Sequence, residues 1–247
     1  MSAPTDPHKQ RTLSQEQVEA FHHDLFVEDQ VRDFIHLLPQ RVSGTRVVDL
    51  GGGCGFFARR LRSAAGYPVR VIDLDEASVR ACHEAGLDAE LGNALDAPLC
   101  DDEHAATLNL ILHHLVAESE AKTRALQVRA LSQLRGRVER VFVNEYIYES
   151  FVGTSSGWLI FQITKSAVLS AIGRAVATVV PAFKANTFGV GVRFRSHQEW
   201  RTLFKEAGFA VVGHSQGSPE RVALPLRLLL IRNIRRDSFL LQTGGHP

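Results

Sequence analysis

An acidic residue and a cluster of glycines stand together early in the chain, between Asp49 and Gly55. A β-branched run precedes them, and a helical pattern of apolar residues begins at Phe56. Glycine lets the backbone turn through positive φ and come close to a ligand, because no Cβ stands in the way. The first turn of the following helix has N–H groups without partners inside the helix. We therefore expect a strand, a glycine turn and a helix that together bind a nucleotide.

The glycine spacing favours one kind of nucleotide over another. The dinucleotide fingerprint GxGxxG, started at Gly51, requires a third glycine at the position of Phe56. An acid followed by glycines at alternate positions fits the sequence instead. The second predicted strand ends at Asp73, where an acid can accept hydrogen bonds from both ribose hydroxyls and disfavours a ribose 2′-phosphate. An NAD(P)-dependent oxidoreductase remains an alternative class of protein.

Three segments in sequence order carry a resemblance to a known family. Asp49–Gly55 resembles the first motif of the class I S-adenosylmethionine-dependent methyltransferases. Val71–Ser78 is similar to their second motif, in which Asp73 is the acid that holds the ribose. Leu91–Asp96 resembles their Gly-Asp-Ala segment, whose polar side chain faces the adenine. Here Asn93 replaces the acid, and its carbonyl oxygen can still accept a hydrogen bond from the adenine amino group.

Two further segments extend the resemblance, which covers most of residues 46–145 and resumes over 196–234. Leu108–Leu115 resembles the end of the fourth strand and the following turn, which implies that Asn109 lies near the methionine part of the cofactor. Trp200–Phe209 resembles the last helix running into the sixth strand. The resemblance implies S-adenosyl-L-methionine as the cofactor and S-adenosyl-L-homocysteine as its product. The cofactor-binding residues that we predict are Asp49, Gly51, Gly53, Gly55, Asp73, Leu74, Asn93, Ala94, Asn109 and Gln30.

The implied reaction is in-line methyl transfer from a sulfonium, in which positioning of the nucleophile supplies most of the catalysis. It needs no metal, and we predict no metal ligands. A general base is needed only where the acceptor carries a proton at the working pH. The candidates, which follow the carboxyl ends of two predicted strands, are His113, His114, Glu145 and Tyr146. Each candidate also has an alternative role. The histidines can hold a neighbouring loop through hydrogen bonds, and Glu145 can hold the N-terminal helix or the methionine amino group. Tyr146 can line the pocket.

Composition limits the classes of protein that the chain can belong to. Its 247 residues are 45% hydrophobic, enough for one well-buried domain. With 28 basic and 27 acidic residues, the net charge of +1 argues against nucleic acid as a partner. The three cysteines lack CxxC spacing and suggest neither a zinc site nor disulfides.

Met1–Arg11 lacks an apolar signal-peptide core, so we expect a cytoplasmic protein. Polar and charged residues interrupt the apolar stretch Gly157–Phe183, so we expect no membrane span.

Strands and helices alternate along the chain, which predicts an α/β fold with a parallel sheet. We expect a Rossmann-like, seven-stranded, mostly parallel sheet with helices on both faces and an antiparallel last strand. Residues 1–40 are predicted as an N-terminal tail and helical cap, 41–148 and 196–247 as the core, and 149–195 as a helical insertion after strand 5. The predicted strands are Arg46–Leu50, Val69–Asp73, Ala89–Leu91, Ala105–Asn109, Val138–Asn144, Phe209–His214 and Leu226–Ile234. The predicted helices between them are Phe56–Ala65, Glu76–Ala85, Glu118–Leu134 and Glu199–Ala207.

The predicted insertion, 149–195, is where this chain differs from the family pattern. Its apolar helical content predicts either a lid that forms the acceptor pocket or a homodimer interface. An apolar lid favours a small-molecule acceptor with a hydrophobic or aromatic body. The function that we predict is therefore a small-molecule methyltransferase. A catalytically silent subunit that binds the cofactor is the second alternative.

Overall fold

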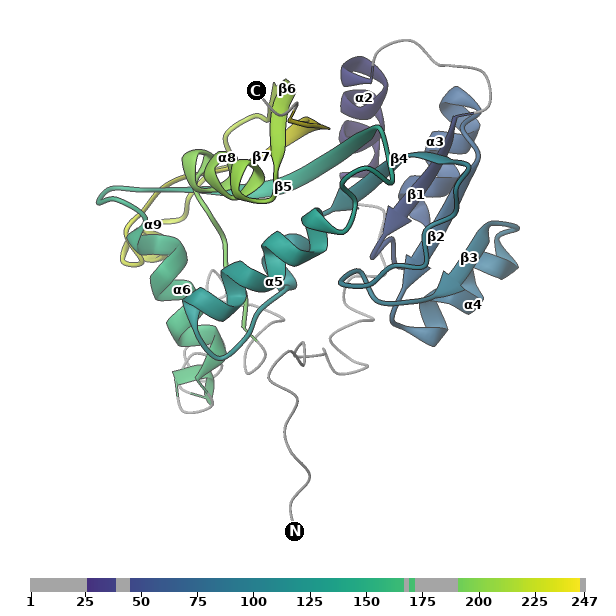
Figure 1. Ribbon diagram of the computed structural model, residues 1–247. Coiled ribbons are helices and arrows are strands. Elements are labelled where there is room, and N and C mark those ends of the chain that lie inside the picture. The colour runs from purple at the N-terminus through teal and green to yellow at the C-terminus, as the bar shows by residue number, and fades with distance from the viewer. Residues whose placement is uncertain (1–25, 39–44, 167–168, 172–190, 245–247) are drawn as a thin grey trace.

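The computed structural model describes residues 26–38, 45–166, 169–171 and 191–244 (Figure 1). The tail expected over residues 1–12 and the first part of the N-terminal cap lie outside the described residues. The elements in chain order are α2 (Val27–Leu37), β1 (Arg46–Leu50), α3 (Phe56–Ala65), β2 (Val69–Asp73), α4 (Glu76–Glu84), β3 (Asp88–Leu91), β4 (Glu103–Asn109), the 3₁₀ turn η1 (Leu112–His114), α5 (Glu120–Ser132), β5 (Arg140–Ser150), α6 (Ser155–Lys165), α8 (His197–Glu206), β6 (Phe209–Gln216), α9 (Leu224–Arg227) and β7 (Ile231–Thr243).

One seven-stranded sheet organises the described chain, in the order β3-β2-β1-β4-β5-β7-β6. The neighbours from β3 to β5 pair in parallel. β7 runs antiparallel to both β5 and β6. The expected mostly parallel sheet with an antiparallel last strand is confirmed. Because the parallel strands share one direction, the carboxyl ends of β1, β2, β4 and β5 point to the same side of the sheet.

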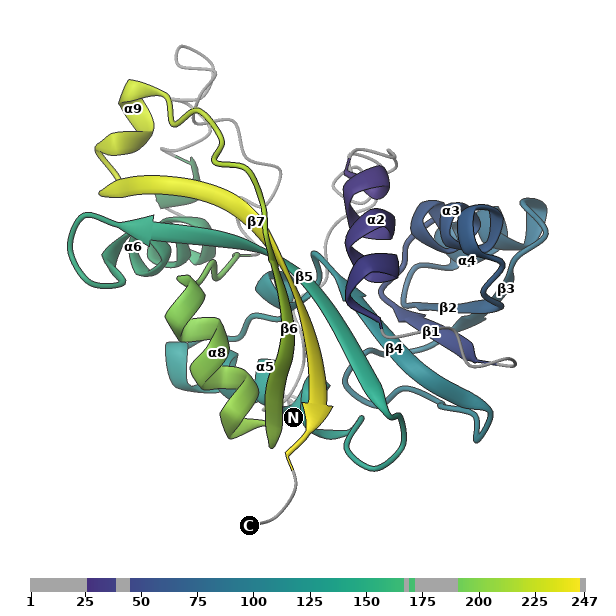
Figure 2. The same ribbon diagram turned by 90° about the horizontal axis from the view of Figure 1, so that it is seen from above.

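Helices cover both faces of the sheet, as Figure 2 shows: α2, α3 and α4 lie on one face, and α5 and α8 on the other. Each face has its own apolar core. On the α2 face, the fully buried ring of Phe34 meets three other rings edge-on, those of Phe57, Tyr67 and Phe142, at centroid distances of 5.9, 5.5 and 5.4 Å. Trp200 of α8 is fully buried on the opposite face.

Side-chain caps fix where several helices begin. Asp75 accepts a hydrogen bond from the Ser78 N–H at 2.8 Å and caps α4. Ser196 and Glu199 form a reciprocal capping box at the start of α8. Such caps satisfy N–H groups that the first turn leaves unpaired.

Two predicted boundaries near the end of the sheet are wrong. The predicted last strand, Leu226–Ile234, begins in a helix, because α9 spans Leu224–Arg227 and β7 starts only at Ile231. A short leucine-rich run fits a buried strand and a helix equally well, and Pro225 near the N-terminus favours the helix. The fifth strand does not end near Glu145 but continues to Ser150, into the predicted insertion.

The described part of the chain contains no helix with the length and apolar character needed to cross a bilayer. Within the predicted insertion, α6 accounts for part of the expected helical content. The rest of that segment, residues 167–168 and 172–190, lies outside the described residues.

We predict that Phe34→Ala lowers the free energy of unfolding by about 3–5 kcal/mol, because it leaves a cavity among three aromatic rings. Chemical denaturation at equilibrium measures this change. Ile35→Ala is the matched control, since that side chain is 43% exposed. A similar loss in both variants would mean that α2 does not depend on its buried face.

Candidate functional site

Polar side chains lie near the carboxyl ends of four strands, at the same edge of the sheet. Asp49 precedes the last residue of β1, Asp73 ends β2 and Asn109 ends β4. Glu145 lies on β5, one residue beyond Asn144, which pairs with Asn109. In open α/β sheets ligands bind outside the carboxyl ends of the strands. The predicted residues on these strands therefore meet at a place suited to a ligand.

The glycine turn after β1 has the conformation that the sequence predicts. Gly51, Gly53 and Gly55 have φ angles of 68°, 53° and 73°. A Cβ on Gly52 would lie 2.5 Å from Asp49 Oδ2, so the turn packs closely over that carboxylate. A Cβ on Gly53 would meet no atom of the described residues within 4 Å. Among the described residues, no side chain caps the start of α3.

Asp49 is fully buried beneath the turn. Its Oδ1 accepts hydrogen bonds from Thr107 Oγ1 at 2.6 Å and Asn109 Nδ2 at 3.3 Å. Its Oδ2, and Oδ1 of Asn109, are buried without a hydrogen-bond partner in the described part of the chain. Burial raises the pKa of the Asp49 carboxyl to about 6, although the hydrogen bonds from β4 lower it. Two buried acceptor atoms on hydrogen-bonded side chains thus have no donor among the described residues.

Asp73 connects the glycine turn to the start of α4. Its two oxygens accept hydrogen bonds from the N–H groups of Gly53, at 2.8 Å, and Asp75, at 2.9 Å. Burial raises the pKa of the Asp73 carboxyl, and the backbone N–H groups oppose that shift. The carboxylate is partly exposed, so hydroxyl groups of a ligand can still reach it. Leu74, beside it, is 46% exposed.

Three other predicted cofactor contacts already have hydrogen-bond partners within the protein. Asn93 Oδ1 accepts a hydrogen bond from Leu95 N at 2.9 Å, so its carbonyl oxygen is already used once. Ala94 is buried, and its carbonyl oxygen accepts a hydrogen bond from Gln133. Gln30 of α2 donates from Nε2 to Asn144 Oδ1 at 3.2 Å. In this arrangement Gln30 fastens the helical cap to β5.

Glu145 holds the loop that follows β4. It is fully buried, and its Oε1 accepts from Leu112 N at 2.7 Å. Its Oε2 lies 2.6 Å from Nδ1 of His113. Neither role that we considered for Glu145, contact with the N-terminal helix or with a methionine amino group, accounts for these bonds. A proton on His113 Nδ1 leaves Nε2 as an acceptor, which is the arrangement of a histidine base oriented by a carboxylate.

The other candidate bases are electrically neutral at ordinary pH. Burial, and then the neighbouring His113, hold the pKa of His114 well below its usual value. Burial raises the pKa of the Tyr146 phenol to about 12. These shifts leave His114 unprotonated and Tyr146 unable to supply a phenolate.

One residue that the sequence analysis missed is Phe194, close to the end of the predicted insertion. Its ring lies 4.9 Å from the His113 ring and 4.2 Å from the Tyr148 ring, nearly parallel to the latter. Tyr146 meets it edge-on at 5.8 Å. No spacing motif marks Phe194, because the contact joins segments far apart in the sequence. The insertion thus contributes an aromatic wall beside the His113–Glu145 pair.

No family model matches the sequence, and no curated protein matches it in sequence. Solved structures do match the fold. A putative methyltransferase from Haloferax volcanii, in complex with the Trm112 methyltransferase activator, has a TM-score of 0.60 and 15% identity over 97% of this chain and 99% of that one. Geranyl diphosphate C-methyltransferase from Streptomyces coelicolor A3(2) has a TM-score of 0.56 and 14% identity over 97% and 86%. The chain has the class I methyltransferase fold.

The class I methyltransferase fold does not by itself decide the reaction. The [4+2]-cyclase SpnF matches this chain with a TM-score of 0.59 and 12% identity, over 96% of this chain and 85% of that one. A protein described as a cyclase therefore shares the fold with proteins described as methyltransferases. Function must be argued from the side chains at the site.

We predict that Asp49→Asn stabilises the ligand-free protein at pH 7.5 by about 3 kcal/mol, because a tenfold change in proton affinity is worth about 1.4 kcal/mol. The folded protein keeps a proton on Asp49 up to a pKa of about 6, whereas the ordinary pKa of a free aspartate side chain is 3.8. Charging Asp49 therefore costs the folded state increasingly as the pH rises from about 4 to above 6. The advantage of the variant must shrink as the pH falls through this range.

Denaturant unfolding at several pH values between 5 and 8 measures this difference. Asp96→Asn, at an exposed side chain, is the control and changes stability little at any pH. An advantage of Asp49→Asn that stays constant with pH would show that packing, rather than charge, sets the cost of this residue.

Proposed function

We propose that the chain is an S-adenosylmethionine-dependent methyltransferase that acts on a small-molecule acceptor. The observation that carries the proposal is a pair of buried acceptor atoms, Asp49 Oδ2 and Asn109 Oδ1, that have no donor among the described residues. The first of them lies directly against Gly52 of the glycine turn. Buried polar atoms normally have partners, so these two favour a ligand that brings hydrogen-bond donors. The ammonium group of a methionine moiety is such a donor. Bound at this edge, S-adenosylmethionine would supply an electrophilic methyl group on its sulfonium.

The charge of the edge favours a cationic ligand over a pyrophosphate. Asp49 and Asp73 lie on neighbouring strands, and the charge of Asp73 contributes to the raised pKa of Asp49. A nearby cation favours the ionised form of a carboxyl, whereas an anion disfavours it. A nicotinamide dinucleotide would bring two phosphates to the same turn. Position 56 is a phenylalanine, whereas the dinucleotide fingerprint GxGxxG requires its third glycine there, and this also argues against a nicotinamide dinucleotide.

Asp73 is suited to hold a ribose. Its oxygens point two ways, toward the N–H groups of Gly53 and Asp75, and are fixed before any ligand arrives. A carboxylate held in this way loses little freedom on accepting two further hydroxyl donors. Leu74 is exposed next to it and offers an apolar surface for a base.

We predict that Asp73→Ala weakens the binding of S-adenosylhomocysteine by about 1.5–3 kcal/mol, the value of hydrogen bonds to a charged group. Isothermal titration calorimetry measures the loss. Asp75→Asn is the matched control, because Asp75 lies two residues away and caps α4. Equal affinities of the wild type and Asp73→Ala would contradict the ribose assignment. Tight binding of NADH without binding of S-adenosylhomocysteine would contradict the proposed function.

His113 is the residue best suited to remove a proton from the acceptor. Glu145 fixes its ring through Nδ1, and Phe194 packs against its face. As the acceptor atom attacks the methyl group, Nε2 can take the acceptor proton, and Glu145 stabilises the imidazolium that forms. A hydroxyl acceptor needs this help more than an amine that is already unprotonated.

We predict that His113→Gln lowers the rate of methyl transfer to a hydroxyl acceptor by about 10²–10⁴-fold, the usual contribution of a general base. Affinity for S-adenosylhomocysteine stays unchanged. Radiolabelled S-adenosylmethionine, offered with a panel of phenols, carboxylic acids and amines, identifies the acceptor and measures the rate. His104→Gln, at an exposed residue of β4, is the control. Full activity of His113→Gln on a hydroxyl acceptor would remove the base role. Binding of the cofactor without transfer to any compound would favour a silent subunit.

The predicted insertion, 149–195, is proposed as the segment that selects the acceptor. Phe194 brings one ring from this segment to the wall formed by Tyr146 and Tyr148, which supports an acceptor with an aromatic or apolar body. Phe151 and Trp158, in the same segment, are 55% and 47% exposed, which supports a homodimer interface as a second role. The near-neutral net charge of +1 supports a partner other than nucleic acid. A cytoplasmic location is part of the same proposal.

A further inference from the structure

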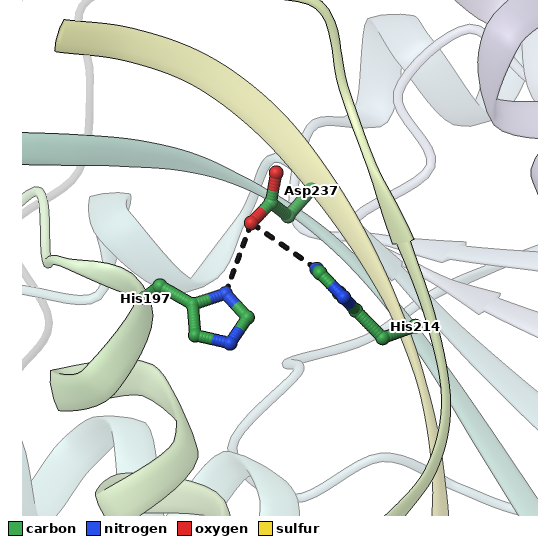
Figure 3. Close-up of side chains that lie close together, drawn as sticks. All are labelled: His197, His214 and Asp237. Atoms are coloured by element: carbon green, nitrogen blue, oxygen red, sulfur yellow. Dashed lines mark hydrogen bonds and ion pairs between the residues drawn. The ribbon is translucent and has the colours of Figure 1, made fainter.

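Two histidines and an aspartate from three different elements converge on the α8 face of the sheet, as Figure 3 shows. His197 is the first residue of α8, His214 lies on β6 and Asp237 on β7. Asp237 Oδ2 lies 3.0 Å from His197 Nδ1 and 3.2 Å from His214 Nε2. Within the described ranges, this is the group of three whose ligand atoms all lie within 4.8 Å of one another.

The carboxylate of Asp237 is fully buried and held from behind. Its Oδ1 accepts hydrogen bonds from Arg235 Nε at 2.9 Å and from Gly217 N at 3.2 Å. Arg235 also reaches Oδ2 through Nη2, at 3.2 Å. Carboxylates that bind metals are commonly oriented by such outer hydrogen bonds. Oδ2 is thereby turned toward both imidazole rings.

We propose that His197 Nδ1, His214 Nε2 and Asp237 Oδ2 bind a divalent first-row transition metal ion, for which zinc is the probe. Two imidazole nitrogens and one carboxylate oxygen are a ligand set that such ions accept. The two histidine side chains are 24% and 28% exposed, so the ion can enter and water can complete its coordination. In a tetrahedral site each ligand atom is about 2.0–2.2 Å from zinc, and the ligand atoms are therefore about 3.4 Å from one another. The distances from Asp237 Oδ2 to the two imidazole nitrogens, 3.0 and 3.2 Å, are slightly shorter, and small rotations of the exposed rings adjust them to the ion.

The charged groups around the cluster favour a cation overall. Asp237 and Glu149 are acidic, and Arg235 is the basic residue that contacts both, at 3.6 Å from Glu149. The two carboxylates outweigh the one guanidinium when the imidazoles are neutral. In the ion-free protein each imidazole can donate a proton to Asp237 Oδ2. When the ion binds, these two nitrogens use their lone pairs, and the ring protons move to the opposite nitrogens.

An ion bound here would stabilise the contacts between neighbouring elements of the fold. It would replace the hydrogen bonds by which the two histidines already join the start of α8 and β6 to Asp237 of β7, and it would add to the packing around Phe239. Asp237 stands directly opposite Glu145 in the β5–β7 pairing, so its side chain lies on the same face of the sheet as Glu145. An ion at this place stabilises the β7 side of the site independently of whether a methyl donor binds.

The test is zinc titration of the full chain after removal of metal by chelation and dialysis. Calorimetry is expected to give one zinc per chain at this site, and the thermal midpoint rises with zinc concentration because the ion binds only the folded state. His197→Gln and His214→Gln each weaken this binding by at least about tenfold, since loss of an outer partner alone costs about 10–100-fold. His104→Gln, at an exposed histidine on β4, behaves like the wild type.

Two results would overturn the proposal. One is zinc affinity that stays the same in both His197→Gln and His214→Gln, which would mean that other groups bind the ion. The other is a wild-type thermal midpoint that does not respond to zinc. Cobalt(II) added to the wild type provides a measurement that needs no variant. Visible absorption typical of cobalt bound to nitrogen and oxygen ligands at stoichiometric metal supports the site, and the spectrum of aqueous cobalt alone contradicts it.

Discussion

The site is built around one fully buried carboxylate, that of Asp49. Asp49 sits on β1, receives hydrogen bonds from β4 through Thr107 and Asn109, and is covered by the glycine turn at Gly52. The turn can come this close only because position 52 lacks a side chain. The same turn brings the N–H group of Gly53 to the carboxylate of Asp73. The site therefore depends on the carboxylate of Asp49, whose ionised form destabilises the folded protein.

The sequence predicted those parts of the structure that depend on neighbours along the chain. The bounds of β1, α3 and β2 follow from a β-branched run, a glycine cluster and helical periodicity, and all three were correct. The prediction failed where a local pattern is ambiguous, as in the leucine-rich run before β7. Cysteine and histidine spacing gave no sign of the cluster around Asp237, because its members come from α8, β6 and β7.

Contacts between residues far apart in the sequence also determine the hydrogen-bond partners of the predicted site residues. His113 and Glu145 were both expected at the carboxyl edge, but their pairing was not, since it joins residues on separate elements. Gln30 was expected to touch the cofactor, yet its amide is bonded to Asn144. Sequence patterns therefore indicated on which strands and helices these residues lie and left their hydrogen-bond partners undetermined. Polar groups in a buried setting take whichever partners the packing brings to them.

The position of β7 between β5 and β6 has a consequence for how the polypeptide assembles during synthesis. β6 leaves the ribosome before β7, yet it has no place in the sheet until β7 has paired with β5. During that interval the edge of β5 presents unpaired backbone groups, which other chains can recruit into intermolecular sheets. The unpaired edge of β5 is therefore an aggregation risk until β7 has paired with it, and a chaperone that covers the edge lowers that risk.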